Sequence, residues 1–155
     1  MTEEKTEQTQ NETKPKSEIW EFIKFSLLAI IIVIPIRLWI AQPFIVSGNS
    51  MAPTFHNGDY LIIDELSYEV RKPERGEVIV FRYPKNPSQF FIKRIAGLPG
   101  ETINGIILAN NEYYVLGDNT SASSDSRYWG PVKSNLIVGR ALVRLWPVSG
   151  LGFSF

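Results

Sequence analysis

Three residues have side chains suited to chemistry: Ser50 in the segment 47–54, Lys93 in the segment 90–95, and His56. A serine hydroxyl is a poor nucleophile until a base removes its proton. His56 is the only histidine of the chain and follows Ser50 by six positions, so a loop would have to fold back on itself to join the two side chains. Lysine is the remaining base, and these residue types therefore favour a Ser–Lys pair.

The lysine needs a particular environment to act as a base. Its reference pKa of about 10.4 leaves it protonated at neutral pH, and a depression of about 3 units corresponds to roughly 4 kcal/mol, which desolvation can supply. In an extended segment Phe91, Lys93 and Ile95 share one face, whereas Arg94 points to the other, where it can stay solvated or pair. The same pattern also fits an edge-strand lysine that blocks aggregation. Pattern alone leaves both interpretations open.

The segment around Ser50 also has a plain structural interpretation, as a turn. Gly48 tolerates a positive φ, and Pro53 forces Ala52 out of the α region. A third polar segment, from Gly117 to Arg127, can equally be a long loop in which Asp118 and Asn119 form a turn.

Composition excludes several classes of site. The chain has 155 residues, no cysteine and a formal net charge of zero, so thiol catalysis, disulfides and thiolate metal sites are excluded. A catalytic zinc is not expected, because His56 is the only imidazole. The basic residues are scattered, so no nucleic-acid partner is expected.

The N-terminal part of the chain changes character near Trp20. Residues 1–19 are almost entirely polar, and we expect them to form a disordered tail. Residues 20–41 are predicted to form a transmembrane helix, with Trp20 and Trp39 about 28 Å apart along it and able to occupy the two membrane interfaces. The uncharged centre, 25–36, is short enough that a buried core helix must also be considered.

Flanking charges predict how this helix is oriented. Lys14, Lys16 and Lys24 lie on its amino side, and only Arg37 follows before Arg71. The positive-inside rule then places the N-terminus in the cytoplasm and residues 42–155 outside the plasma membrane, in a single-pass arrangement.

After residue 41 the sequence takes on the pattern of short strands. Runs of β-branched and aromatic residues alternate with turn-forming residues, and no helix is convincing. The pattern predicts an all-β barrel or coiled sheet. The predicted strands are 43–46, 60–63, 77–83, 89–95, 106–108, 112–116 and 136–145.

Three segments in this order behind an apolar run resemble the type I signal peptidases: Ser47–Thr54, Phe91–Glu101 and Gly117–Arg127. The resemblance extends from about Phe25 to Val143, and three matching blocks are far more specific than one. It implies a mainly β, signal-peptidase-like catalytic domain behind one N-terminal transmembrane helix. It also implies a serine endopeptidase with Ser50 as the nucleophile and Lys93 as the general base, without a cofactor. A lysine at the base position points to the bacterial branch of the family.

The resemblance assigns supporting roles as well. The backbone N–H of Ser50 corresponds to one oxyanion donor, while the hydroxyl that supplies a second donor in some members falls on Gly48. The serine that orients the lysine corresponds to Ser123, and the supporting carboxylate and guanidinium correspond to Asp125 and Arg127. Most members carry an additional β-rich segment where this chain has only Glu101–Leu116.

The implied substrates are exported preproteins with cleavable signal peptides, and the other implied partner is membrane lipid. Small side chains are expected one and three residues before the scissile bond of an extended substrate that adds as a strand. Two other classes stay open: a self-cleaving repressor domain, and a non-catalytic, membrane-anchored β-domain that binds exported chains. The repressor would need a DNA-binding helical module, and the presence of both Ser50 and Lys93 argues against the non-catalytic domain.

The C-terminal segment 145–155 is apolar but contains a proline and two glycines. Two interpretations are possible. Trp146 and Leu151 complete the core, or Phe153 and Phe155 enter the membrane interface.

Overall fold

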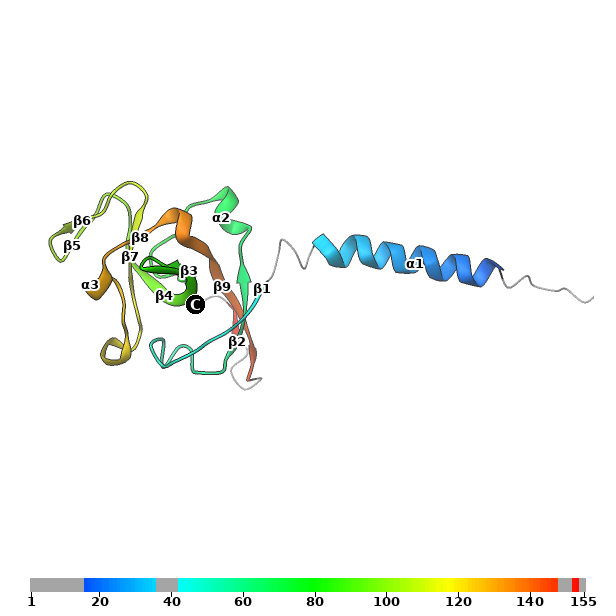
Figure 1. The fold of residues 1–155 in the computed structure, drawn as a ribbon, viewed down its shortest axis with the longest axis horizontal. Coiled ribbons are helices and arrows are strands. Elements are labelled where there is room, and N and C mark those ends of the chain that lie inside the picture. The colour runs from blue at the N-terminus through cyan, green and yellow to red at the C-terminus, as the bar shows by residue number, and fades with distance from the viewer. Residues whose placement is uncertain (1–15, 36–41, 148–151, 154–155) are drawn as a thin grey trace, which may run out of the picture. The chain divides into compact units, whose positions relative to one another are not determined.

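The computed structural model describes residues 16–35, 42–147 and 152–153. The chain divides into two units, Met1–Pro35 with the N-terminal helix and Ile36–Phe155 with all the strands (Figure 1). The two units are described separately.

Helix α1 (Lys16–Pro35) forms the first unit and is apolar along most of its length. The large side chains from Ile19 to Val33 are exposed, including Phe22 and Phe25. The ammonium of Lys24 lies 5.7 Å from the centre of the Trp20 ring, one helical turn away. The helix begins before Trp20, where the predicted tail was expected to end, because Lys16, Glu18 and Ile19 are compatible with a helical backbone.

None of the helices in the described part of the chain combines the length and apolar character needed to span a bilayer. The predicted transmembrane segment, 20–41, includes residues 36–41, which lie outside the described residues.

The described residues of the second unit are mainly β, as predicted, and also form two four-residue α-helices and two 3-10 helices. In chain order its elements are β1 (Gln42–Ile45), β2 (Tyr60–Asp64), α2 (Ser67–Val70), β3 (Val78–Tyr83), β4 (Asn86–Gly97), β5 (Thr102–Ile103), β6 (Ile106–Ile107), β7 (Glu112–Leu116), η2 (Thr120–Ala122), α3 (Ser126–Trp129), β8 (Val132–Lys133), η3 (Ser134–Leu136), β9 (Ile137–Trp146) and β10 (Gly152–Phe153).

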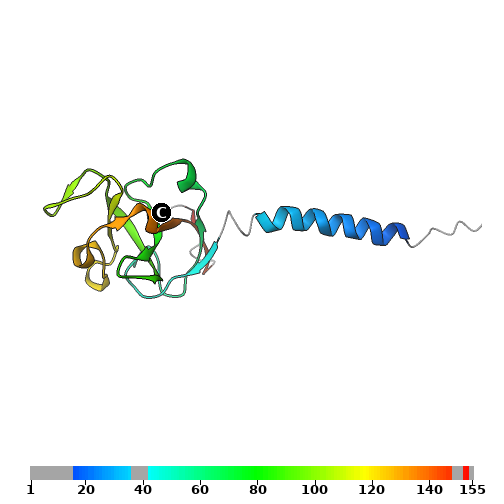
Figure 2. The same ribbon diagram turned by 45° about the horizontal axis from the view of Figure 1, so that its top comes forward.

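An eight-stranded sheet with antiparallel pairing carries the unit. Its strand order is β1-β2-β9-β3-β4-β7-β8, with β10 paired to β9, while β5 and β6 form a separate ribbon. Figure 2 shows the strands turning around the body of the unit instead of lying flat, as the twist of β-strands requires. β1 therefore lies at one edge of the sheet, and β8 lies at the other.

Strand β3 explains why the core has two parts. Val78 and Val80 pack into one apolar cluster, which also contains Met51 and Phe55. Ile79 and Phe81, on the opposite face, pack into another with partners from β4, β7 and β8. Because both faces of β3 are covered, its first four residues form a continuous apolar run and not an alternating one.

Most predicted strands are confirmed, with differences at their ends. β4 begins at Asn86, three residues before the predicted start, because Asn86 pairs with Tyr83 across the turn formed by Pro84 and Lys85. The helices α2 and α3 are corrections to the all-β prediction; α3 forms because Asp125 caps its first turn by accepting a hydrogen bond from the backbone N–H of Arg127.

The C-terminal prediction is only partly within the described residues. Trp146 is 58 % exposed, so it does not complete the core as one interpretation expected. The backbone of Phe153, in β10, pairs with that of Val143 in β9, and Leu151 and Phe155 lie outside the described residues.

Candidate active site

The loop from Val46 to Phe55 presents Ser50 between β1 and β2. Gly48 has a φ of +90°, which favours glycine, and its backbone N–H donates to Asn57 Oδ1 at 2.9 Å. The part of the loop that follows Ser50 is held in place, because the side chains of Met51 and Phe55 are fully buried in the core. The serine is thereby held at the surface by buried neighbours on its C-terminal side.

Lys93 lies on β4, with its side chain buried and its ammonium beside this loop. Nζ is 2.7 Å from Ser50 Oγ and donates to the carbonyl oxygen of Ile92 at 2.9 Å. The predicted alternation is confirmed: Lys93 and Ile95 are buried, and Arg94 points away into an ion pair.

The environment of Lys93 favours its neutral form. Burial lowers the pKa of Lys93 to about 8, against the opposing effect of the Asp125 and Asp118 carboxylates, which stabilise the ammonium. Nζ lies 5.5 Å from the centre of the Phe91 ring. A substantial fraction of these lysines is therefore neutral in weakly alkaline solution.

An aromatic cluster stands behind Phe91 and was not expected from the sequence. The Phe91 and Tyr83 rings stack at 4.5 Å, and Trp129 meets the edge of Tyr83 at 5.8 Å. Trp129 comes from α3, far along the chain, so only the folded sheet brings these rings together. They give Lys93 an apolar surrounding on this side.

The three supporting residues that the resemblance assigned lie together around one carboxylate. Asp125 is fully buried and accepts hydrogen bonds from Ser123 Oγ at 2.7 Å and from the guanidinium of Arg127 at 2.7 and 2.8 Å. The backbone N–H of Gly117 also donates to it, at 3.1 Å. Burial alone would raise the pKa of Asp125, but these hydrogen bonds lower it to about 2.

Ser123 has a different partner from the one implied. Its hydroxyl donates to Asp125, and the hydrogen bonds of Lys93 within the described residues go to Ser50 and Ile92. The structure therefore brings Ser123 into the site without a hydrogen bond to the lysine.

A second carboxylate, Asp118, was predicted only to form a turn and instead ties three segments together. It accepts from Arg94 at 2.7 and 2.9 Å and from Thr54 Oγ1 at 2.6 Å. Burial raises its pKa, but the hydrogen bonds from Arg94 and Thr54 outweigh this and leave it below the usual value. Arg94 neighbours Lys93 and Thr54 follows Ser50 in the same loop, so these bonds hold β4 and the Ser50 loop in place relative to each other.

The role of Gly117 was also not expected from the sequence. This glycine lies where its own loop comes very close to the loop that carries Ser50. A Cβ atom there would lie 2.5 Å from the carbonyl oxygen of Ser50 and 2.2 Å from Ser123 Oγ. Beside it, the backbone N–H of Asn119 donates to the same Ser50 carbonyl at 2.9 Å. Only glycine lets the two loops touch here.

A groove of about 500 Å³ opens beside Ser50 and Lys93. Its lining comes from β1 and the following loop, from β3 and β4, and from the η2 region: Phe44, Ile45, Val46, Ser47, Gly48, Asn49, Ser50, Val80, Gln89, Phe90, Phe91, Ile92, Lys93, Ala122 and Ser124. In the described residues β7 pairs with β4 only from Arg94 onward, so β4 has an unpaired side from Gln89 to Lys93. The groove thus lies between the edge strand β1 and this free side of β4.

Two further expectations concern groups at the margin of the site. His56 is exposed, and its backbone N–H donates to Asp59 at 3.0 Å, as expected of a loop residue. Within the described residues the backbone N–H of Ser50 donates to no protein acceptor, whereas the backbone N–H of Gly48 donates to Asn57. The described part of the chain holds no group of three or more His, Cys, Asp or Glu side chains arranged for a metal ion.

Comparisons with known proteins agree on one family. Residues 19–106 and 104–146 match the family described as "Signal peptidase, peptidase S26". The chain is 37 % identical to the probable signal peptidase I-2 of Synechocystis sp., over 98 % of this chain and 85 % of that protein. It is 31 % identical to the signal peptidase I of Bacillus caldolyticus, over 83 % of this chain and 92 % of that one. A crystal structure of a signal peptidase I from Enterococcus faecalis matches with a TM-score of 0.40 and 30 % identity, over 46 % of this chain and 97 % of that chain.

Proposed function

The chain belongs to the signal peptidase family, peptidase S26, and is a serine endopeptidase that cleaves signal peptides; from this premise we propose that Ser50 and Lys93 form its catalytic dyad. The observation that carries the proposal is the 2.7 Å separation of Lys93 Nζ and Ser50 Oγ at a buried lysine. Because the chain belongs to a peptidase family, nothing supports the alternative of a non-catalytic β-domain that only binds exported chains.

In the proposed reaction, neutral Lys93 accepts the proton of Ser50 Oγ while this oxygen attacks the carbonyl carbon of the scissile peptide bond. The ammonium that forms is held by the Ile92 carbonyl and by the field of Asp118 and Asp125. It then protonates the amine of the leaving mature protein, which departs and leaves an acyl ester on Ser50. Lys93, neutral again, takes a proton from water while the water oxygen attacks the acyl carbon. The ammonium then returns this proton to Ser50 Oγ as the ester C–O bond breaks, so the cleaved signal peptide leaves with a new carboxyl group and Ser50 and Lys93 are restored.

The backbone N–H of Ser50 is the proposed donor to the oxyanion of the tetrahedral intermediate. The Ser123–Asp125–Arg127 group supports the site from behind: Asp125 binds the Gly117 N–H, and Gly117 packs against the Ser50 carbonyl. These three residues act as positioning residues, because they fix the Gly117 backbone, against which the Ser50 backbone packs.

The substrate is proposed to lie extended in the groove between β1 and β4. Both strands offer unpaired backbone groups there, which suits the addition of a peptide as a further strand. The apolar lining fits the small side chains expected one and three residues before the scissile bond of an exported preprotein.

We further propose that the N-terminal helix anchors the enzyme in the plasma membrane, with residues 42–155 outside. The exposed apolar side chains on α1 suit a lipid environment. The basic residues Lys14, Lys16 and Lys24 favour a cytoplasmic N-terminus. Protease added to intact cells should digest the region after residue 41 and spare the tail; loss of the tail with protection of that region would reverse the orientation.

The dyad is tested with the purified full-length protein and a preprotein that carries an Ala-x-Ala site, with the cut mapped by mass spectrometry. Ser50→Ala and Lys93→Arg should each reduce kcat/KM by more than about a thousandfold, because arginine does not lose its proton at accessible pH. His56→Ala should cleave like wild type. An active Ser50→Ala, or Lys93→Arg within tenfold of wild type, would sink the assignment, and a dead His56→Ala would reopen a histidine mechanism.

A further inference from the structure

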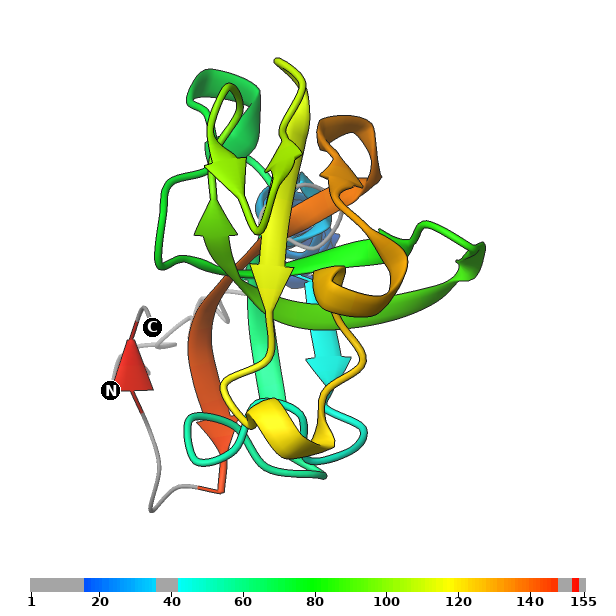
Figure 3. The same ribbon diagram turned by 90° about the vertical axis from the view of Figure 1, so that its left-hand side faces the viewer.

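A second pocket, of about 400 Å³, opens in the strand unit away from Ser50. Its lining comes from the α2 region, from the turn before β7, and from η3 and the start of β9, and it shares no residue with the groove. β2 follows the Ser50 loop and ends before Glu65, and β7 carries Tyr113 near its start and ends before Gly117. Figure 3 accordingly shows α2 and η3 at one end of the unit, and η2 with the Ser50 loop at the other. The pocket therefore lies at the opposite end from the proposed dyad.

Glu65 brings to this pocket a carboxylate that has no partner in the protein. Its Oε1 is shielded from solvent and accepts no hydrogen bond within the described residues. Burial raises the pKa of Glu65, and no positive charge opposes this effect. By contrast, five other partly or fully buried carboxylates of the unit each form an ion pair with an arginine: Asp59, Asp64, Glu77, Asp118 and Asp125. A positive charge placed beside Glu65 would therefore be stabilised.

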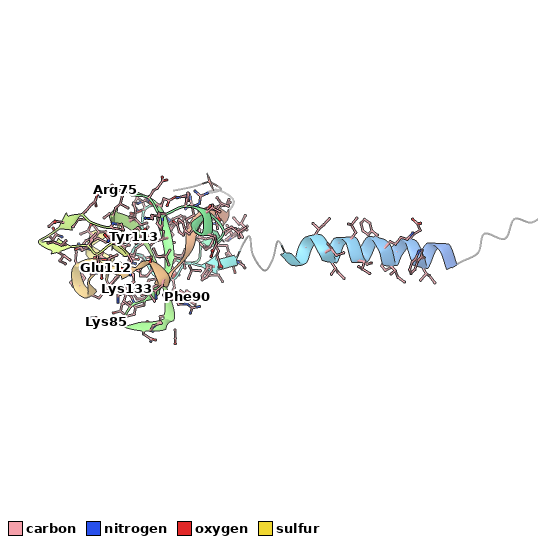
Figure 4. All side chains as sticks on the ribbon, turned by 90° about the horizontal axis from the view of Figure 1, so that it is seen from above. Arg75, Lys85, Phe90, Glu112, Tyr113 and Lys133 are labelled. Carbon is pink, nitrogen blue, oxygen red and sulfur yellow. The ribbon has the colours of Figure 1, made fainter. Side chains whose placement is uncertain are left out.

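Tyr113 supplies a second polar group that the protein leaves unused. Its side chain lines the pocket and is only 3 % exposed, and its hydroxyl makes no hydrogen bond within the described residues. A buried phenol hydroxyl normally has a partner. Figure 4 labels Tyr113 among the packed side chains of the unit. Two polar groups from distant parts of the chain, Glu65 and Tyr113, thus line one pocket without a partner.

The charges around the pocket favour a cation as its ligand. One of the charged side chains in the lining is already neutralised, because Arg71 forms an ion pair with Glu77, which is not part of the lining. The other charged groups are Glu65, Glu69 and the exposed Lys72. Two carboxylates against one ammonium leave the pocket with an excess of negative charge.

The size and walls of the pocket indicate an organic cation. A volume of about 400 Å³ falls in the range of pockets that hold organic molecules and is much larger than one metal ion needs. Ile137 and Val138 form an apolar part of the wall, and Asn110 and Asn111 add amide groups at its exposed rim. A long basic side chain has the matching construction, an apolar stem with a charged, hydrogen-bonding end.

We propose that this pocket binds a basic side chain of a polypeptide, arginine in preference to lysine, with its charged end at Glu65 and Tyr113 and its stem along Ile137 and Val138. A guanidinium has five N–H donors in one plane, so it can donate to a carboxylate and a phenol oxygen together. Because the enzyme acts on polypeptides, basic side chains are the cations that its substrates bring to it. The inference does not depend on which residues form the dyad.

The direct test is a titration of the full-length protein with Nα-acetyl-arginine amide, followed by saturation-transfer NMR of the probe. For a probe of this size we expect a Kd of about 1 mM. Nα-acetyl-citrulline amide has nearly the same shape without the charge and should bind at least about tenfold more weakly. Putrescine represents a soluble amine and should also bind more weakly, because an ammonium lacks the planar set of donors.

Two variants remove the proposed contacts one at a time. Glu65→Gln keeps the size of the side chain and should weaken binding of the arginine probe at least about tenfold, and Tyr113→Phe should weaken it by about threefold. Glu74→Gln is the matched control, since the Glu74 side chain is 74 % exposed and does not line the pocket; its Kd should equal that of wild type. Without the probe, Glu65→Gln and Tyr113→Phe should unfold at the same urea concentration as wild type or a higher one, because each removes a buried group without a partner. A merely structural role would lower that concentration.

Three binding results would overturn the inference: equal affinity for the arginine and citrulline probes, an unchanged Kd in Glu65→Gln, or tighter binding of putrescine, which would assign the pocket to a soluble amine. A saturating arginine probe should leave cleavage of an Ala-x-Ala preprotein within about twofold. Inhibition that persists in Glu65→Gln would place the probe in the groove and would also overturn the inference. Failure of wild type to cleave any such preprotein would instead count against the proposed function, and the titration would be unaffected.

Discussion

The Gly117–Arg127 loop contains two carboxylates that each form an ion pair with an arginine, and the two ion pairs differ in burial and in the segments that they connect. Asp125 pairs with Arg127, two residues away, and its side chain is fully buried. Asp118 pairs with Arg94 and Thr54, 24 and 64 residues away, and keeps 16 % of its side chain exposed. The local pair shapes the loop, and the long-range pair connects that loop to β4 and to the loop after β1, which carry the proposed dyad.

The two pairs also share an effect on the base. Both carboxylates stabilise the ammonium of Lys93, so each opposes the burial that makes this lysine neutral. Burial prevails and leaves the pKa of Lys93 at about 8. The comparison separates two functions of charge at this site: holding the backbone in place, and setting the protonation of the lysine.

The largest loss of activity is expected from a substitution of Gly117, which lies in the loop that both pairs support. Gly117→Ala places a Cβ atom against the Ser50 carbonyl and Ser123 Oγ, so the two loops must separate. We expect more than about a hundredfold loss in kcat/KM from the misplaced serine and a loss of about 2–3 kcal/mol in the free energy of unfolding. Activity assays and urea titration measure these. Ser121→Ala, in the same loop but exposed, serves as the control, and full activity of Gly117→Ala would contradict the packing described.

Removing the local pair should mainly affect stability. Asp125→Asn replaces a buried, fully bonded carboxylate and leaves Ser123, Gly117 and Arg127 with a poorer acceptor. The expected loss is about 2–4 kcal/mol of unfolding free energy at pH 7, measured by urea titration. A loss below about 0.5 kcal/mol would show that the pair contributes little.

This loss should depend on pH in a defined direction. The pKa of Asp125 is lowered on folding, from an ordinary 3.8 to about 2, so its charge stabilises the fold at pH values above about 4. That contribution disappears as the pH falls from about 4 to about 2. The difference in stability between wild type and Asp125→Asn should therefore shrink over this range.

Removing the long-range pair should affect activity more than stability. Asp118→Asn weakens bonds to a partly exposed arginine and to Thr54, for which we expect about 1–2 kcal/mol of unfolding free energy. kcat should fall by about tenfold, because the serine loop and β4 lose their common tie. A double-mutant cycle with Arg94→Gln should give a coupling of about 1 kcal/mol or more; strict additivity would mean that the two residues act independently.

The smallest effect is on the pH dependence of the reaction. kcat/KM of wild type should rise with pH through about 8 as Lys93 loses its proton. Asp118→Asn and Asp125→Asn each remove a charge that stabilises the ammonium, so each should move this rise to lower pH. Asp125→Asn should move it further, because Asp125 is the larger of the two contributions. A rise that moves to higher pH in either variant would contradict this electrostatic assignment.

Much of the β framework was predictable because strand patterns are local. The alternation around Lys93 identified which side chains turn inward, and turn residues between apolar runs located most strand ends. α3 was missed, because four residues carry no helical periodicity and the helix depends on the Asp125 cap. One of the two interpretations of the C-terminal segment placed Trp146 in the core, and its exposure shows why the alternatives stayed open: an aromatic residue at a strand end fits a core and a surface equally well.

The residues proposed for the site came from motifs, whereas the contacts that cross the chain were not predicted. Ser50, Lys93, Ser123, Asp125 and Arg127 were assigned from the resemblance, and the structure brings them close together. Asp118 was missed, because its partners are remote in sequence and a Gly-Asp-Asn segment is also an ordinary turn. The requirement for Gly117 follows from a distance between two loops, which no sequence pattern contains.

The ribbon formed by β5 and β6 has a consequence for how this enzyme can be altered. Its turn consists of Asn104 and Gly105, both with positive φ, and the ribbon pairs with no other strand among the described residues. The ribbon is attached to the body of the unit by Ile103, which packs closely over Gly97, but Asn104 and Gly105 in the turn are exposed. Since the entropy cost of a longer loop grows only with the logarithm of its length, this turn should accept a spliced-in epitope or fluorescent reporter while the fold and its chemistry continue unchanged.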